Sequence, residues 1–345
     1  MVLKSFLRRS DDYEKEIPFF SAYYFRKTER RNENRQMKTK VYVSGSRGMV
    51  GRNAIENLDT SKYEILAPSS AELNLLDFSA VKSFLAEKKP DMIIHCAGKV
   101  GGIQANIKDS YGFFTENMLM GIHLIKAAVD TGIPRFLNLS SSCSYPYDAP
   151  NPLTEEMVFA GKLEPTNEGY AIAKASLLRL CTFVSRQFSD KKYKTLIPCN
   201  LYGRFDKFGE QNSHMIPAVI KKLHAAKTNS LASVEIWGDG TARREFMFAT
   251  DLALMIAEIL ERFDDMPDFM NIGLGYDFTV NEYYQAVAKI VGYTGGFTHD
   301  LTKPAGMKQK LLDVSKQTAF GLKPRFSLEE GVARTYAYYL EQEEK

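Results

Sequence analysis

Long apolar runs, paired cysteines and a strong excess of one charge are all missing from this chain of 345 residues. No uncharged apolar stretch reaches the ~18 residues that a membrane-spanning helix needs, so we expect no membrane partner. The four cysteines stand far apart with no CxxC pair, which argues against a disulfide scaffold and against a metal site. A formal net charge of +3 argues against broad nucleic-acid binding.

The basic excess lies in the first 40 residues, which hold 11 Lys and Arg against 6 Asp and Glu. Acidic residues interrupt any apolar run there, so the segment lacks the pattern of a secretory signal. We expect residues 1–38 to form a mobile N-terminal extension ahead of the folded chain. Reduced cysteines and the lack of an export signal predict a cytoplasmic location.

From Lys40 onward, short β-rich runs alternate with helical patterns. The expected strands and helices lie, in alternation, at 40–44, 48–58, 63–67, 79–88, 91–97, 111–131, 135–140, 167–188 and 193–199. This alternation predicts an α/β fold, a Rossmann-type doubly wound parallel sheet with helices on both faces.

After about Asn200 the pattern changes to polar loops, short strands and late helices, which predicts a smaller C-terminal substrate-binding lobe. We therefore expect a dinucleotide-binding domain at 39–200, with a returning segment near 244–275. The substrate-binding lobe is expected at 201–243 and 276–345.

A glycine-rich turn follows the first expected strand and opens the first expected helix. It reads Gly45-Ser46-Arg47-Gly48-Met49-Val50-Gly51, with the spacing GxxGxxG. Gly45 permits a tight turn, Gly48 lets the backbone approach a pyrophosphate, and Gly51 lets the helix pack on the strand. Because a helix N-terminus offers amide donors to phosphates, we predict that these seven residues bind a dinucleotide. The alternative is a tight turn without a ligand.

The choice between NAD(H) and NADP(H) depends on the end of the second strand. An NAD site carries an acidic residue there, but this end reads Ala67-Pro68-Ser69-Ser70. Arg47 can pair with a 2′-phosphate, so we predict NADP(H). Asp77 follows the second strand, and we expect it either to reach the adenine or to cap the next helix.

Tyr170 and Lys174 form a YxxxK pair on the helix expected at 167–188. A spacing of four residues places both side chains on one helix face, one turn apart. An ammonium close to a phenol favours the phenolate and lowers the tyrosine pKa from about 10. Tyr170 can then exchange a proton with an alcohol or ketone oxygen near neutral pH. Ser141 precedes the pair at the end of an expected strand.

This Ser…Tyr-x-x-x-Lys order resembles the extended short-chain dehydrogenases/reductases, and further segments resemble the GDP-L-fucose synthase family over about Lys40–Glu341. These segments are Lys99–Ile103, Ser141–Pro146, Glu164–Lys174, Asn200–Gly203, Asn212–Pro217, Trp237–Gly238, Arg243–Phe246 and Lys310–Asp313. The resemblance implies 3,5-epimerisation of GDP-4-keto-6-deoxy-D-mannose and NADPH-dependent reduction at C4, which together yield GDP-L-fucose.

The same resemblance implies residue roles. Ser141 would hydrogen-bond the reacting oxygen, and Lys174 would also hold the nicotinamide ribose. Cys143 and His214 would be the base and the acid of the epimerisation. The residues that would line the nicotinamide are Pro198, Cys199, Asn200 and Leu201. The residues that would bind the nucleotide diphosphate are Lys222, Trp237, Arg244 and Lys310.

Other interpretations stay open at this point. One is a nucleotide-sugar 4-epimerase or 4,6-dehydratase of the same fold with tightly held NAD, although dehydratases carry an Asp-Glu pair where this chain has Ser142-Cys143. A second is a catalytically silent binding protein, which the complete Ser/Tyr/Lys set argues against. A related 3,6-dideoxy 4-keto sugar is a further candidate substrate. The resemblance implies a homodimer through the helices at 111–131 and 167–188, but their apolar residues would equally well cover the sheet.

Overall fold

The computed structural model describes residues 37–209, 213–303 and 307–344. The chain divides into two units, Met1–Lys38 and Thr39–Lys345, and the features that follow belong to the second. The expected N-terminal extension lies outside the described residues except for its last two positions, and Asn212, close before His214, also lies outside them.

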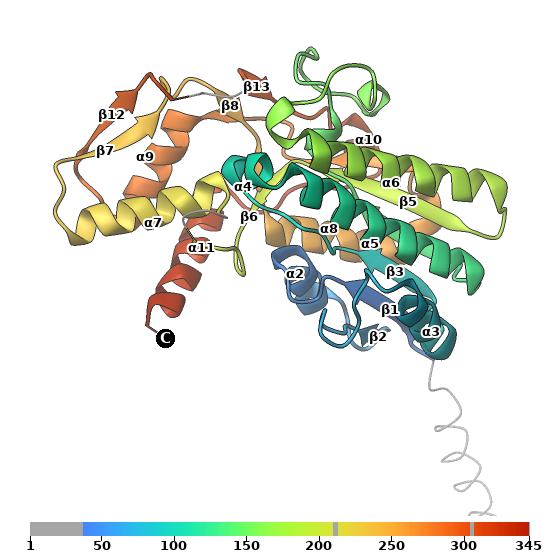
Figure 1. Ribbon diagram of the computed structural model, residues 1–345. Coiled ribbons are helices and arrows are strands. Elements are labelled where there is room, and N and C mark those ends of the chain that lie inside the picture. Colours follow the sequence, from blue (N-terminus) through green and yellow to red (C-terminus); the bar gives the residue numbers. More distant parts are fainter. Residues whose placement is uncertain (1–36, 210–212, 304–306, 345) are drawn as a thin grey trace, which may run out of the picture. The chain divides into compact units, whose positions relative to one another are not determined.

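Six strands form the main sheet (Figure 1). They are β1 (Thr39–Ser44), β2 (Tyr63–Leu66), β3 (Met92–His95), β4 (Arg135–Leu139), β5 (Lys192–Pro198) and β10 (Phe269–Ile272). Their order is β10-β5-β4-β3-β1-β2, and every pairing is parallel. The predicted Rossmann-type fold is confirmed. Since β1 lies between β2 and β3, the winding reverses there, and ligands of such sheets bind at that point.

Strand side chains alternate between two apolar layers, as a sheet covered on both faces requires. Val41 and Val43 of β1 belong to one cluster and Tyr42 to another. Helices α3 (Phe78–Lys88), α5 (Ser110–Asp130) and α6 (Glu168–Gln187) contribute to the Tyr42 layer. Helices α2 (Met49–Asn57) and α8 (Ala249–Glu261) contribute to the opposite layer.

A separate apolar core joins α7 (Met215–Thr228), α9 (Val280–Val291) and α11 (Leu328–Glu343) to β7 (Ser233–Trp237). Strand β7 pairs with β12 (Gly296–Asp300), and β6 (Asn200–Tyr202) pairs with β9 (Phe246–Phe248). Strand β8 (Arg243–Arg244) lies between β11 (Phe278–Thr279) and β13 (Gln309–Lys310). Short elements complete the described chain: α4 (Ile103–Lys108), α10 (Ser315–Ala319), and the 3-10 turns η1 (Ser142–Ser144), η2 (Glu155–Met157), η3 (Pro165–Asn167) and η4 (Phe263–Asp265).

The apolar residues of α5 and α6 divide between two surroundings. Leu124, Leu177 and Leu178 are buried in the core, whereas Leu119 and Ile122 are 44% and 37% exposed. The first group covers the sheet, and the second stays at the surface of the described chain. No helix among the described residues is both long enough and apolar enough to cross a membrane.

Glu245, between β8 and β9, connects three segments of the chain. Its carboxylate is buried and accepts hydrogen bonds from the backbone N–H groups of Leu274 at 2.6 Å, Gly275 at 2.9 Å and Leu312 at 3.0 Å. Burial raises the pKa of this carboxyl to about 7. The Glu245 side chain therefore connects two segments that are distant in sequence, Arg243–Phe246 and Lys310–Asp313.

Replacing Glu245 with alanine leaves three backbone N–H groups without their acceptor. Because each unpartnered buried donor costs roughly 1–3 kcal/mol, we expect Glu245→Ala to lower the free energy of unfolding by about 3 kcal/mol or more in urea titrations. Glu258→Ala is the matched control, since Glu258 forms a solvent-exposed ion pair with Arg325 and such pairs contribute little. Equal losses for the two variants would contradict this role for Glu245.

Candidate active site

The glycine turn after β1 is a close-packed cradle. Gly45 has φ +71°, and a Cβ atom there would lie 2.6 Å from the backbone N of Ala97 after β3. A Cβ atom on Gly51 would lie 2.2 Å from the Gly45 carbonyl oxygen. The turn leads into α2, whose N-cap residue Gly48 provides no side-chain cap. Among the described residues, no side chain therefore occupies the N-terminal amides of α2, which is compatible with phosphate binding there; that binding stays a prediction.

A cleft of about 640 Å³ opens along the carboxyl ends of the sheet strands. Most of the predicted cofactor and catalytic residues line it: Gly45, Ser46, Arg47, Gly48, Met49, Val50, Ser141, Tyr170, Lys174, Pro198, Cys199, Asn200, Leu201 and His214. The structure therefore brings these residues to one cavity although they span 170 positions of sequence. Gly51 lies beneath the turn, where its small size permits the contact of α2 with Gly45.

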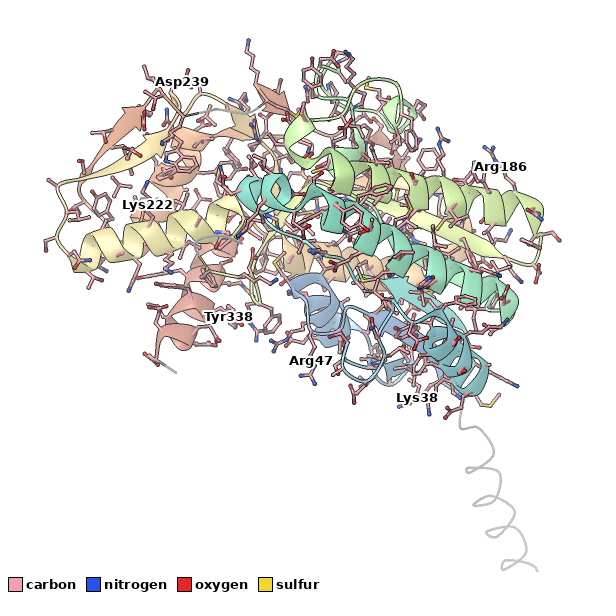
Figure 2. The ribbon with its side chains drawn as sticks, in the orientation of Figure 1. Lys38, Arg47, Arg186, Lys222, Asp239 and Tyr338 are labelled. Atoms are coloured by element: carbon pink, nitrogen blue, oxygen red, sulfur yellow. The ribbon has the colours of Figure 1, made fainter. Side chains whose placement is uncertain are left out.

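Two of the predicted cofactor-binding residues, Asp77 and Arg47, also interact with other parts of the protein. The carboxylate of Asp77 accepts from the backbone N–H of Ala80 at 3.0 Å and so caps α3; its contact with the adenine stays a prediction. Arg47 is exposed at the edge of the cleft beside α2 (Figure 2). The charge of Arg47 acts on the carboxylate of Glu72, which lies in the loop after β2 and which no sequence pattern marks out.

Tyr170 and Lys174 lie on the face of α6 that borders β4. The Lys174 ammonium is buried, donates to the Leu139 carbonyl at 3.0 Å and lies 5.9 Å from the centre of the Tyr170 ring. Burial lowers the pKa of Lys174 to about 8. The Ser141 hydroxyl accepts from the backbone N–H of Cys143 at 3.2 Å and also hydrogen-bonds Tyr170.

The predicted direction of the tyrosine pKa shift is wrong for this structure. Burial raises the pKa of Tyr170 above its usual value, the negative charge of Cys143 adds to the increase, and the hydrogen bond with Ser141 opposes it. The ammonium of Lys174 is directed to the Leu139 carbonyl, so desolvation of the phenol dominates. Tyr170 is therefore neutral at pH 7 and is suited to donate a proton.

Cys143 lies in η1, directly after the end of β4. Its Sγ accepts from the Asn167 amide at 3.4 Å and from the Lys310 ammonium at 3.5 Å. Among the other three cysteines, burial raises the thiol pKa of Cys96 and Cys181 to about 12 and holds that of Cys199 well above its usual value. Asn167 stands three residues before Tyr170 in the segment Glu164–Lys174, but no sequence pattern marks it out for a role.

His214 is the N-cap residue of α7 and lines the cleft together with Asp206. Burial raises the pKa of the Asp206 carboxyl, and the charge of His214 opposes that increase. Among the described residues, Asp206 Oδ2 is buried without a hydrogen-bond partner. Sequence reasoning missed Asp206, since nothing in a polar loop marks one carboxylate as the neighbour of a histidine eight residues later.

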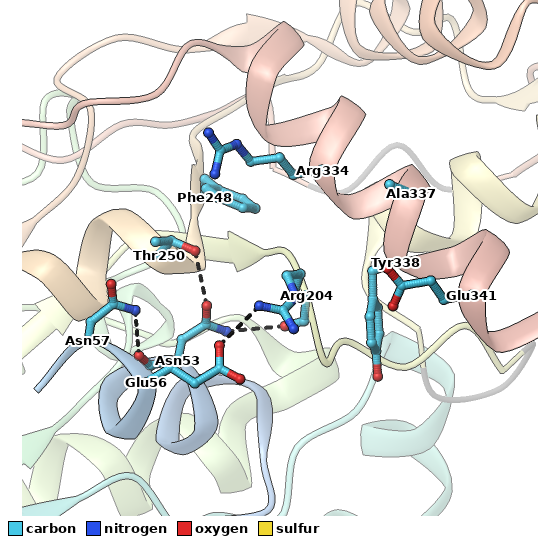
Figure 3. Close-up of a pocket in the computed structure, with 10 residues that line it drawn as sticks. All are labelled: Asn53, Glu56, Asn57, Arg204, Phe248, Thr250, Arg334, Ala337, Tyr338 and Glu341. Carbon is cyan, nitrogen blue, oxygen red and sulfur yellow. Dashed lines mark hydrogen bonds and ion pairs between the residues drawn. The ribbon is translucent and has the colours of Figure 1, made fainter. Parts of the chain in front are cut away.

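The loop that carries Asp206 is attached to the cofactor-side helix α2 (Figure 3). Asn53 of α2 donates to the Arg204 carbonyl at 3.1 Å, and the Arg204 guanidinium pairs with Glu56 at 3.1 Å. Phe205 has φ +70° and its ring packs 3.6 Å from the Arg52 guanidinium. A left-handed conformation is costly for a bulky residue, so these contacts hold the loop in place.

The four predicted substrate-binding residues occupy two places. Lys310 and Arg244 are register partners on β13 and β8, and Lys310 reaches Cys143. Lys222 of α7 donates to the Glu235 carbonyl of β7, and Trp237, at the end of β7, is 53% exposed. None of the four lines the cleft, so their binding roles stay predictions.

Known proteins resemble the chain in sequence and structure. Residues 41–273 match the NAD dependent epimerase/dehydratase family. GDP-L-colitose synthase from Yersinia pseudotuberculosis is 50% identical over 303 residues, which cover 88% of this chain and 98% of that protein. GDP-L-fucose synthase from Azorhizobium caulinodans is 45% identical over 301 residues, covering 87% and 96%. The solved structure of a GDP-mannoheptose C4 reductase from Campylobacter jejuni with NADP bound has a TM-score of 0.80 at 28% identity, covering 88% of this chain and 99% of that one.

A parallel sheet with a glycine cradle at its switch point and a Ser/Tyr/Lys set beside the cleft defines an NAD(P)-dependent enzyme of Rossmann type. The chain belongs to the NAD dependent epimerase/dehydratase family.

The lowered pKa of Lys174 predicts a pH-dependent cost to folding. Between about pH 8 and pH 10.5 the unfolded chain keeps a proton that the folded chain has lost, so stability rises with pH in this window. Below pH 8 the buried ammonium opposes folding. We expect Lys174→Met to be the more stable protein at pH 7, and its advantage to shrink by up to about 3 kcal/mol by pH 10.5. Urea unfolding of both proteins at the two pH values measures this, and a pH-independent difference would contradict it.

Proposed function

We propose that this enzyme acts on a GDP-linked 4-keto-6-deoxy sugar and converts GDP-4-keto-6-deoxy-D-mannose to GDP-L-fucose. It inverts C3 and C5 and then reduces C4. The observation that carries the proposal is the convergence of a Ser/Tyr/Lys set and a histidine around one cleft that also contains the glycine cradle. Cys143 does not line this cleft, but it lies close enough to Tyr170 to act on it electrostatically. The names of the GDP-L-colitose and GDP-L-fucose synthases support the substrate class.

The cofactor is NADP(H). The cradle at Gly45–Gly51 fits a pyrophosphate because any Cβ at Gly45 or Gly51 would meet backbone atoms. Lys174 and the segment Pro198–Leu201 border the same cleft, and the reductase from Campylobacter jejuni holds NADP in its structure. Arg47 is the group we assign to the 2′-phosphate. When bound, NADPH supplies the hydride that reaches C4.

Epimerisation requires a base and an acid on opposite faces of the sugar. In the proposed step, the Cys143 thiolate takes the proton from the carbon next to the ketone. An S–H bond forms, the C–H bond breaks, and its electron pair moves to the C4 oxygen. Hydrogen bonds from Ser141 and Tyr170 stabilise the negative charge on that oxygen. His214 then gives a proton to the same carbon from the other side, with Asp206 beside it.

Reduction uses Tyr170 as an acid. The neutral phenol, whose pKa burial raises, gives its proton to the C4 oxygen when that carbon receives hydride. The buried Lys174, on the same helix face as Tyr170, supplies positive charge on the side of the phenol that becomes negative.

A second candidate substrate is favoured by one comparison. The relative with 50% identity is a GDP-L-colitose synthase, and colitose is a 3,6-dideoxy sugar. A 4-keto-3,6-dideoxy substrate has no hydroxyl at C3, so only C5 would need inversion by Cys143 and His214. An epimerase or dehydratase that recycles NAD is disfavoured, because Ser142-Cys143 stands where dehydratases have their acidic pair.

The test is NADPH oxidation by the purified enzyme with each of the two GDP-4-keto sugars. We expect stoichiometric oxidation of NADPH with at least one of them and slower turnover with NADH. The ratio of kcat/KM for the two sugars decides between the fucose and colitose reactions. Product formation without net NADPH consumption would overturn the reductase and favour a recycling epimerase.

Two variants should separate the two stages. Tyr170→Phe removes the proton donor, so we expect net reduction to fall by a factor of about 10² or more. Cys143→Ser should slow the exchange of C3 and C5 protons with D2O more than it slows reduction of substrate that is already epimerised. NMR detects the exchange and NADPH absorbance the reduction. Equal slowing of both stages by Cys143→Ser would show that Cys143 is not the base.

Three further proposals concern organisation. Residues 39–200, with the return near 244–275, hold the cofactor, and 201–243 with 276–345 hold the sugar nucleotide. A homodimer would form through α5 and α6, where exposed Tyr111, Leu119, Ile122 and Phe183 offer an apolar surface. A cytoplasmic location fits the four free cysteines.

A further inference from the structure

In the structure, the two groups that contact the sulfur of Cys143 are both hydrogen-bond donors. Asn167 presents its amide nitrogen at 3.4 Å and Lys310 its ammonium at 3.5 Å. Neither an ammonium nor an amide N–H₂ group accepts a hydrogen bond. A thiol would offer them a hydrogen that they cannot use, whereas a thiolate accepts from both. The surroundings therefore complement the ionised sulfur.

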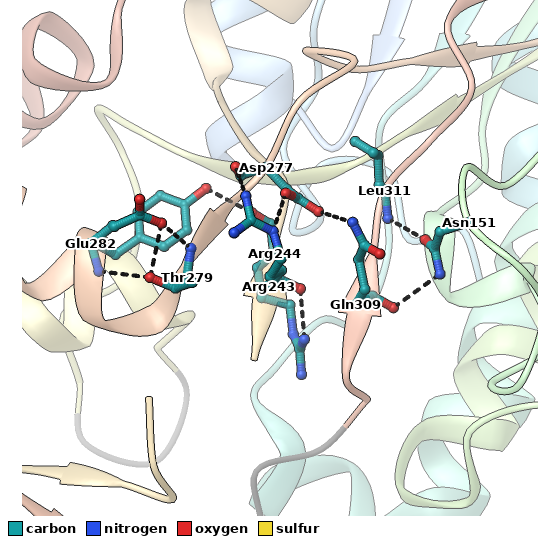
Figure 4. A network of polar contacts seen from close by, with 9 residues as sticks. Asn151, Arg243, Arg244, Asp277, Thr279, Glu282, Gln309 and Leu311 are labelled. Atoms are coloured by element: carbon teal, nitrogen blue, oxygen red, sulfur yellow. Dashed lines mark hydrogen bonds and ion pairs between the residues drawn. The ribbon is translucent and has the colours of Figure 1, made fainter. Parts of the chain in front are cut away.

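The residues directly before and after Lys310, Gln309 and Leu311, are both held by polar contacts (Figure 4). Gln309 donates to the Asp277 carboxylate at 2.7 Å, and the same carboxylate pairs with Arg243 at 2.6 Å. On the other side, the Leu311 N–H donates to the Asn151 side chain at 2.8 Å. Because the residues before and after Lys310 are fixed, its ammonium meets the sulfur without a large loss of chain entropy.

Asn167 shows a second sign of a specific role. Within the described part of the chain, its Oδ1 is buried and has no hydrogen-bond partner. An unpartnered buried amide oxygen is unfavourable, so the orientation that turns Nδ2 to the sulfur has a cost. Rotating the amide by half a turn would bring Oδ1 to the sulfur, where it can accept from S–H after Cys143 has taken a proton. One side chain can thus serve both protonation states of the base.

We propose that Asn167 and Lys310 are positioning residues that hold Cys143 as the thiolate base, so that the ammonium of Lys310 serves the sulfur and not the diphosphate. This inference rests on the proposed function for its catalytic meaning, and it reassigns Lys310 from the role that resemblance implied. The described titratable groups that face the sulfur are Lys310 from β13 and Tyr170 from α6.

The direct test is the pH dependence of alkylation of Cys143 by iodoacetamide, followed by peptide mass spectrometry without substrate. Only the thiolate reacts, so the midpoint of the rate reports its ionisation. The other three cysteines react slowly because burial raises their pKa values. We expect Lys310→Met and Asn167→Asp each to move the midpoint up by about one pH unit, which is about tenfold slower alkylation at pH 7.

The variants are chosen so that folding does not confuse the result. The Asn167 side chain makes no capping hydrogen bond to the first turn of α6, so Asn167→Asp replaces a donor with a negative charge and removes no helix cap. Lys310→Arg keeps the cation and should retain most of the alkylation rate. Lys308→Met and Asn229→Asp make the same charge changes at exposed positions and should leave the midpoint unchanged. NADPH binding checks that each variant is folded.

Each outcome decides the proposal. Shifted midpoints in Lys310→Met and Asn167→Asp, with slower C3 and C5 exchange and near-normal reduction of epimerised substrate, support it. Unchanged midpoints overturn it. A raised KM for the GDP-sugar in Lys310→Met without a midpoint shift would return Lys310 to the diphosphate. If wild-type enzyme turns over neither sugar while the midpoints still shift, the thiolate assignment holds and the proposed substrate fails.

Discussion

The parallel register of the central strands is the constraint on which the site depends. Because β1, β3, β4 and β5 run in the same direction, their carboxyl ends reach one edge of the sheet. The glycine turn, Ala97 and Ser141 follow the ends of β1, β3 and β4, and β5 ends at Pro198. Gly45 and Ala97 approach each other so closely that no side chain fits between the ends of β1 and β3. The backbone of the glycine turn itself can therefore face a ligand. A shift of one strand by a single residue would exchange the two faces of that strand and separate these groups.

Polar contacts hold segments from the C-terminal part of the chain in place beside the cleft. Glu245 joins the chain after β13 to β8 and β9, Asp277 positions Gln309, and Asn53 holds the loop before His214. These contacts are made largely to backbone atoms, which define where a segment runs better than exposed ion pairs do. The sulfur base and its cation therefore depend on residues that never meet the substrate.

Burial determines the protonation behaviour at the centre of the site. Desolvation raises the pKa of Tyr170 and lowers that of Lys174. Tyr170 is therefore a neutral acid, and it lies next to a lysine that loses its proton more easily than a lysine in water. His95 is buried as well and hydrogen-bonds Ser44 at 2.8 Å, and burial lowers its pKa to about 3. It is therefore a neutral structural group. Placing polar groups in such surroundings lowers stability in exchange for reactivity.

The sequence by itself determined the strand and helix alternation, the glycine cradle and the Tyr170/Lys174 pair, because each depends on local periodicity or on a spacing of a few residues. It also indicated Ser141, Cys143 and His214 through resemblance. Only the tertiary structure decided that Asp77 caps a helix, that Asp206 accompanies His214, and that Asn167 and Lys310 meet the sulfur of Cys143. It also decided the direction of the Tyr170 pKa. These facts depend on burial and on contacts between residues as much as 167 positions apart, and neither quantity is expressed in the local pattern of a chain.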